Sequence, residues 1–168
     1  MRKLHSMLVL FGALCFGTAC NKTLSEEDSA AKKRAEEFQA AVLTHKYKIS
    51  AFYSDKAIDY ITSDTEVKSE TDLWGYVKEH IKDDENYFGA NGTLTVYQKA
   101  ARIAGNDAET INTGYGIGAK GADVAVTFVD YSYKPLEYKL LEFDNAYFTV
   151  YVDGPGGAKL YTKYARVE

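Results

Sequence analysis

From residue 124 to residue 133 the sequence reads Val-Ala-Val-Thr-Phe-Val-Asp-Tyr-Ser-Tyr. Large apolar side chains at Val124, Val126 and Phe128 alternate with small or polar ones. This period of two is typical of a strand with one buried face. Leu94 and Val96 show the same period further upstream. The alternation predicts a sheet in the second half of the chain.

Turn residues divide this half of the chain into strands. The strongest turn signals are Gly105-Asn106-Asp107 and Asp153-Gly154-Pro155-Gly156-Gly157, because glycine, asparagine and proline fit the backbone angles of turns. Residues 134–145, which contain Pro135, are expected to form a long connection. The expected strands span residues 94–103, 108–115, 124–133, 147–152 and 160–167.

The first half of the chain shows a helical period instead. Residues 26–45 and 69–82 each predict a helix, because apolar residues recur at steps of three and four. Between these helices we expect a short helical turn at 49–53 and a short strand at 57–61. The first apolar stripe consists of Ala31, Ala35, Phe38, Val42 and His45, and the second of Leu73, Trp74, Val77 and Ile81.

Helices followed by antiparallel strands predict an α+β fold, in which N-terminal helices cover the apolar face of one curved sheet. The length of 168 residues fits a single domain. All fourteen tyrosines lie beyond residue 45. Tyrosine suits a half-buried sheet surface, because its hydroxyl can stay hydrated.

Residues 1–19 predict a signal peptide. A basic start is followed by an apolar run from residue 7 to residue 16, which is too short to cross a bilayer as a helix. Ala19 and Cys20 resemble the cleavage site of a bacterial lipoprotein, with Cys20 as the lipidated residue, although Gly17 stands where that signal usually has leucine. An ordinary signal peptidase would cut the same bond. The interpretation places the protein in the bacterial cell envelope, with residues 20–29 as a polar tether and residues 30–168 as the folded domain.

The polar stretch after Cys20 has two interpretations. Ser25-Glu26-Glu27-Asp28 has the spacing of a helix capping box, in which Ser25 and Asp28 satisfy each other's backbone. An acidic stretch that follows a lipidated cysteine also resembles the surface-export signal of some Bacteroidetes lipoproteins.

Composition and charge exclude several classes of function. Cys15 would leave with the signal peptide and Cys20 would carry the lipid, so the folded domain has no thiol for a disulfide or a thiolate metal site. The processed chain has 18 basic and 24 acidic residues, a net charge of −6, which disfavours nucleic-acid binding. We expect membrane contact through the lipid anchor only, and neither a cofactor nor a metal ion.

One short motif resembles a known superfamily. Phe52-Tyr53-Ser54-Asp55-Lys56-Ala57 is similar to the entry into the first strand in the nuclear-transport-factor-like superfamily, which includes the SnoaL-like and ketosteroid-isomerase-like families. The order of the expected elements is similar as well. The resemblance implies a cone-shaped, cystatin-like roll that encloses a pocket for a small, mainly apolar ligand. It also implies a homodimer that forms through the sheet face.

Two residues are candidates for catalysis, Asp59 and His45. The general-base aspartate of the isomerases falls on Ile61 here, so their mechanism does not carry over. Asp59 lies two residues earlier, and a carboxylate in an apolar pocket can act as a base. Each candidate also has a structural interpretation, because Asp59 can face solvent in a strand and His45 can cap the first helix.

The remaining candidates for a binding site are four aromatic residues and a segment with three glycines. Phe38, Phe52, Tyr53 and Trp74 either line a pocket or form ordinary core, because both structures use the same residue types. The segment 114–119 has the glycine spacing of a dinucleotide fingerprint. That fingerprint needs a helix after the glycines, whereas a strand is expected here, so a bulge or bend is the better interpretation.

The sequence therefore favours a cell-envelope lipoprotein with a non-catalytic domain that binds a small molecule or acts as an accessory subunit. Two alternatives stay open. One is an isomerase-, cyclase- or dehydratase-type enzyme that uses Asp59 or His45 as its base. The other is a protein-interaction module that uses the open sheet face and its tyrosines.

Overall fold

A computed structural model describes residues 25–61, 67–103, 105, 108–130 and 132–168. Cys20 and the expected signal peptide lie outside these residues. None of the described helices is long and apolar enough to cross a membrane.

The helix α1 (Glu26–Val42) begins at a capping box, as the spacing of Ser25 and Asp28 predicts. The Ser25 hydroxyl accepts the Asp28 N–H at 3.1 Å, and the Asp28 carboxylate accepts the Ser25 N–H at 3.3 Å. The expected apolar stripe of this helix is buried as far as Val42. His45 lies beyond the end of the helix, in the connection to the first strand.

Strands dominate the rest of the described chain. Short helical segments interrupt them at η1 (Trp74–Tyr76), α2 (Glu79–Asp83) and η2 (Pro155–Gly157). The nine described strands are β1 (Lys46–Ile61), β2 (Val67–Asp72), β3 (Glu85–Phe88), β4 (Thr93–Tyr97), β5 (Thr110–Lys120), β6 (Asp123–Val129), β7 (Pro135–Phe143), β8 (Tyr147–Asp153) and β9 (Lys159–Val167).

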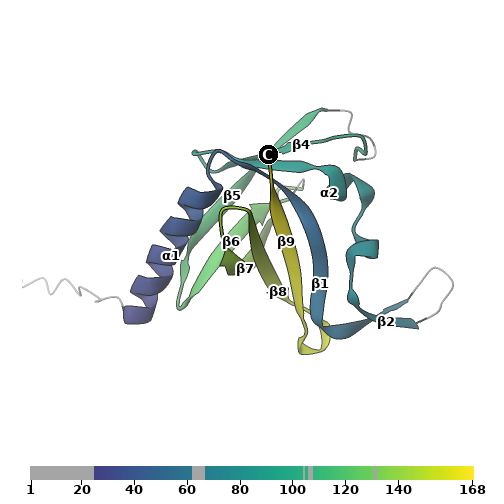
Figure 1. Cartoon of the computed structure of the whole chain (residues 1–168), viewed down its shortest axis with the longest axis horizontal. Helices are drawn as coiled ribbons and strands as arrows, with labels where there is room; N and C mark the ends of the chain where they lie inside the picture. The colour runs from purple at the N-terminus through teal and green to yellow at the C-terminus, as the bar shows by residue number, and fades with distance from the viewer. Residues whose placement is uncertain (1–24, 62–66, 104, 106–107, 131) are drawn as a thin grey trace, which may run out of the picture.

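The strands form one antiparallel sheet that closes on itself. From β3 to β9 each strand pairs with the next in the chain, and β1 pairs with both β3 and β9. The pairing of β1 with β9 runs from Lys46 opposite Val167 to Ser54 opposite Leu160. The result is a barrel of eight strands, and β2 lies outside it because it pairs only with the second half of β1 (Figure 1).

This architecture corrects the expected fold class. The α+β arrangement of several helices on a cone-shaped roll is wrong, because the described chain is a nine-stranded sheet with one long helix. The expected helix at 69–82 is also wrong. The chain there continues as strand β2 to Asp72, and only the short segments η1 and α2 follow. The expected connection at 134–145 is mostly strand β7.

The helix α1 packs against one end of the barrel. Its side chain Phe38 is fully buried, with ring centroids 5.2 Å from both Phe143 and Phe148. Ala35 and Val42 belong to the same core cluster as the inward-facing residues of the strands. In Figure 1 α1 lies at one side of the barrel and α2 at the other. The core is therefore filled at the α1 end.

Candidate functional site

The barrel interior contains a cavity of about 250 Å³ away from α1. Residues from seven strands line it, together with Ile81 of α2. A barrel of eight strands is just wide enough for side chains to fill it or for one small ligand to enter. The lining residues are Ile49, Ile81, Asp84, Asn86, Phe88, Leu94, Val96, Thr113, Phe128, Val129, Asp130, Leu136, Tyr138, Thr162 and Tyr164.

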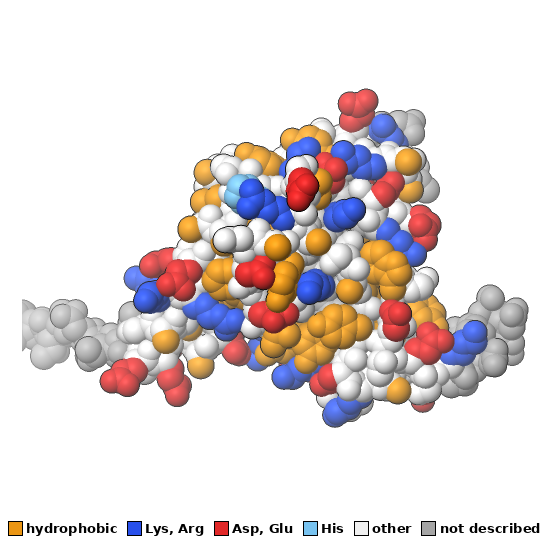
Figure 2. Space-filling model, in the orientation of Figure 1, with side chains coloured by type: hydrophobic (Ala, Val, Ile, Leu, Met, Phe, Trp, Pro, Cys, Tyr) orange, Lys and Arg blue, Asp and Glu red, His pale blue; other side chains and the backbone are white. Residues whose placement is uncertain are grey.

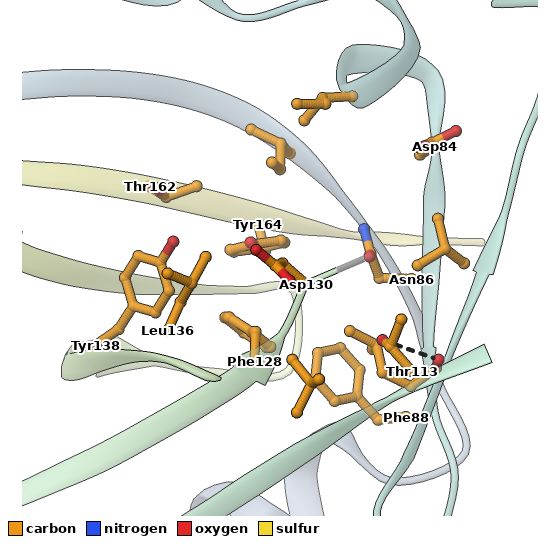
Figure 3. A pocket seen from close by; sticks show the side chains of 15 residues that line it. Asp84, Asn86, Phe88, Thr113, Phe128, Asp130, Leu136, Tyr138, Thr162 and Tyr164 are labelled. Atoms are coloured by element: carbon orange, nitrogen blue, oxygen red, sulfur yellow. Dashed lines mark hydrogen bonds between the residues drawn. The ribbon is translucent and has the colours of Figure 1, made fainter. Parts of the chain in front are cut away.

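Most of the wall is apolar, and aromatic rings hold it in place. Phe88 is fully buried and makes an edge contact with Tyr115 at 5.0 Å between ring centroids. Phe128 packs between Tyr138 at 5.5 Å and Tyr164 at 5.8 Å. Figure 3 shows the rings of Phe88, Phe128, Tyr138 and Tyr164 among the side chains around the cavity. Because interlocked rings resist rotation, the wall is largely preformed.

Several polar groups interrupt this wall. The Asn86 side chain donates Nδ2–H to the Tyr47 carbonyl at 3.4 Å, and the Thr113 hydroxyl donates to the Leu94 carbonyl at 3.5 Å. The Tyr138 hydroxyl makes no hydrogen bond within the described part of the chain. Burial raises the pKa of Tyr138 above its ordinary value, so this hydroxyl stays protonated near neutral pH. Apolar walls with a few placed polar groups are characteristic of small-molecule sites.

A second hollow of about 440 Å³, here called the outer groove, adjoins the cavity. Ile49, Ile81 and Thr162 line both. The groove is completed by Phe52, Tyr76, Val77, Lys78 and His80. The segment from η1 to α2 therefore forms one wall of the groove.

Polar contacts hold this wall in position. The Asp83 carboxylate accepts the Ala101 N–H at 2.9 Å, which ties α2 to the chain beyond β4. Lys82 forms an ion pair with Glu79 at 2.7 Å, and its ammonium lies 5.4 Å from the Trp74 ring centroid. The rim is apolar and open, because Tyr76 of the groove is 41% exposed and Leu136 of the cavity is 46% exposed.

The aromatic residues singled out in the sequence do not meet at one site. Phe52 lines the outer groove. Phe38 of α1 belongs to the core, and the Trp74 ring lies beside the Lys82 ammonium. Neither residue lines these two hollows. Tyr53 stacks on Tyr161 at 5.0 Å, on the pair of strands that closes the barrel.

The two candidate catalytic residues lie outside the cavity lining. Asp59 is exposed and pairs with Ser69 of β2, on the part of β1 that extends beyond the barrel. His45 occupies the connection between α1 and β1. Its N–H bonds the Val42 carbonyl at 3.3 Å, and its own carbonyl accepts the Phe88 N–H at 3.4 Å. Neither belongs to the residues that line the two hollows.

Sequence reasoning missed most of the lining. Asn86 and Phe88 fall between the expected helix at 69–82 and the expected strand at 94–103, and Leu136 and Tyr138 fall in the expected connection. Two alternations were available signals. One gives Leu94 and Val96, and the other runs from Val124 to Asp130 and places Asp130 on the same face as Phe128. Across the described ranges no group of three or more His, Cys, Asp or Glu side chains is placed to hold a metal ion.

No family model and no curated protein matches the chain. Among solved structures, a redesigned β-barrel is similar, with 13% sequence identity and a TM-score of 0.36. That match covers 77% of this chain and 95% of the designed one. A similarity at this TM-score does not establish a fold. The barrel assignment rests on the strand pairing of this chain.

Proposed function

We propose that this chain is a cell-envelope lipoprotein whose barrel binds a small, mainly apolar molecule without transforming it. The observation that supports binding is the cavity of about 250 Å³ that residues from seven strands line. Its preformed wall lowers the entropic cost of binding, because few side chains must become ordered. Asp59, the carboxylate best suited to a general base in the sequence, is exposed outside the barrel, and this favours binding over catalysis.

A matched pair of variants on β5 tests the proposal. Thr113 lines the cavity, whereas the preceding residue in the strand, Asn112, is exposed on the other face. Thr113→Trp should fill the cavity, and Asn112→Trp adds the same ring outside. The probe is the neutral fluorophore N-phenyl-1-naphthylamine, whose emission rises in an apolar site.

We expect the wild-type protein and Asn112→Trp to bind the probe equally well. Thr113→Trp should weaken binding at least tenfold, while far-ultraviolet circular dichroism shows that it is folded. Absence of binding by the wild-type protein would overturn the proposal. Equal binding by the two folded variants would place the probe outside the barrel and would overturn it as well.

The envelope assignment rests on Cys20 and has its own test. Expressed from its own gene in a bacterium, the mature protein should begin at Cys20 and carry a diacylglycerol mass. It should partition into the detergent phase of Triton X-114, whereas Cys20→Ser should remain aqueous. A mature chain that begins at Cys20 without added lipid would contradict the anchor and identify an ordinary secretory signal.

A further inference from the structure

The charged side chains that line the cavity are all acidic. Asp84 and Asp130 line it, and Asp84 is 2% exposed. Of the fifteen described residues in the lining, none is lysine, arginine or histidine. An anion that entered would lose its hydration without gaining an opposite charge, which is costly.

Asp130 is held so that one of its oxygens remains available. It lies immediately after β6, and its Oδ1 accepts the N–H groups of Ser132 and Lys134, each at 2.8 Å. These two bonds fix the side chain in an Asx turn. Its Oδ2 makes no hydrogen bond within the described part of the chain. In Figure 3 Asp130 lies among the labelled side chains that surround the cavity.

The neutral polar groups add further acceptors. Asn86 donates through Nδ2 to the Tyr47 carbonyl, and this orientation leaves its Oδ1 as an acceptor. The hydroxyl oxygens of Thr162 and Tyr138 lie in the same lining. A ligand group that carries several N–H donors would find more partners here than a carboxylate would.

The outer groove has the opposite charge. Lys78 and His80 line it, and no aspartate or glutamate is among its lining residues. A positively charged group is therefore repelled by Lys78 in the groove and attracted by Asp130 in the cavity. This arrangement orients an elongated ligand with its cationic end toward the barrel interior.

From the cavity lining we infer that the ligand is an amphipathic amine, with an apolar or aromatic body and a protonated amino group directed toward Asp130. This inference rests on the proposed binding function and gives it a chemical class. A charge inside a protein is tolerated when it is paired and hydrogen-bonded. The opposite charge comes from the Asp130 carboxylate. Hydrogen-bond acceptors come from Asn86 and from the hydroxyl groups of Thr162 and Tyr138.

Two probes that share a naphthalene ring and differ in charge show whether the site selects its ligand by charge or by shape. The cation is 2-(1-naphthyl)ethylamine and the anion is 1-naphthylacetate. Isothermal titration at pH 7 should show at least tenfold tighter binding of the amine by the wild-type protein. Asp130→Asn should reduce this preference to less than threefold, because it removes the charge and can keep the turn through Oδ1.

Asp144 provides a matched control, because it forms the same kind of turn outside the cavity. Its Oδ1 accepts the N–H groups of Ala146 and Tyr147 at 2.6 and 2.9 Å. Asp144→Asn should keep the full preference for the amine. Equal loss in both variants would overturn the role of Asp130.

The failures of the two proposals are distinguishable. Tighter or equal binding of naphthylacetate by the wild-type protein would overturn the amine class and leave small-molecule binding intact. Absence of binding for both charged probes and for the neutral naphthylamine would overturn the binding function itself. An amine preference that Asp130→Asn leaves unchanged would overturn the assignment to this carboxylate.

Discussion

At the residue scale, Phe88 connects the core to the cavity. It is fully buried, and its ring contacts those of Tyr47, Tyr115, Phe128 and Phe148, with centroids 5.0 to 6.2 Å apart. It also lines the cavity. One side chain therefore supports both the stability of the barrel and the shape of the site.

Phe88→Ala should lower the free energy of unfolding by about 3–5 kcal/mol, because it removes a buried ring and leaves a void. Urea denaturation followed by circular dichroism measures the loss. Phe88→Leu, which keeps most of the apolar volume, should lose clearly less. A loss below about 1 kcal/mol for the alanine variant would contradict the central position of this ring.

Glu85 lies between two ammonium groups at the start of β3. Its carboxylate is 3.0 Å from the Lys99 ammonium and 3.1 Å from that of Lys46, and its side chain is 15% exposed. Burial alone would raise the pKa of Glu85, but the bonds and charges of Lys99 and Lys46 outweigh it and lower the pKa below 4.5. The ion pair is thus a pH-dependent contribution to stability.

Because the folded pKa is the lower one, this contribution is complete above the ordinary pKa of 4.5 and is lost as pH falls through the folded value. Glu85→Gln should therefore lower stability by about 1 kcal/mol at pH 7. The difference between the two proteins should shrink in acid. Urea denaturation at pH 7 and pH 3 measures it, and a difference that grows in acid would contradict the assignment.

At the element scale, bulges explain why two strands look unlike strands in the sequence. The register of β1 against β9 shifts between Ile49 and Ala51. Because of this extra residue, Ile49 and Phe52 both face the outer groove although they are three positions apart. A spacing of three residues is also typical of a helix. The sequence pattern of 49–53 therefore predicts a helical turn where the structure has part of β1.

The alternation of inward and outward side chains in β7 is interrupted in the same way. Its register against β8 shifts between Leu140 and Glu142, so Tyr138, Leu140 and Phe143 point inward although they break the strict alternation. Pro135 occupies the first position of the strand, where the lack of an N–H is tolerated. A bulge inserts one residue, and pattern counting cannot detect it without the partner strand.

The glycines of β5 are ordinary strand residues. Pairing of β5 with β6 runs without a shift from Tyr115 opposite Phe128 to Lys120 opposite Asp123, so the expected bulge is absent at these positions. A Cβ on Gly118 would meet no atom within 4 Å. At Gly154, before the last hairpin turn, a Cβ would lie 2.9 Å from the Leu160 side chain.

Gly154→Ala should therefore cost about 1–2 kcal/mol of stability through overpacking. Gly118→Ala should be neutral or slightly stabilising, because it restricts the unfolded chain without a clash. Thermal unfolding of both variants measures the contrast. A larger loss at Gly118 than at Gly154 would contradict the packing around the turn.

At the scale of the whole molecule, closure between β1 and β9 decides the fold. It joins segments near the two ends of the described chain, from Lys46 opposite Val167 to Ser54 opposite Leu160. Closure gives each of the eight barrel strands a bonded neighbour on both sides, and only β2 remains at an edge of the described sheet. It also encloses the space that becomes the cavity.

Amide hydrogen exchange tests the closure. The strand β9 is bonded on both sides, to β1 and β8, whereas β2 is bonded only to β1. The amides of residues 160–166 should therefore be protected as strongly as those of β6, and the amides of residues 67–72 should exchange faster. Equally fast exchange in β9 and β2 would show that the barrel is open in solution.

The sequence by itself determined the local features of this protein. It located α1 with its capping box and buried stripe, five of the nine described strands and the last residues of β1, because these depend on residues a few positions apart. The tertiary structure decided the closed barrel, the bulged strands and the cavity. Their residues are joined by pairings across the whole chain, such as Ser54 with Leu160, and a local period contains no information about such distant partners.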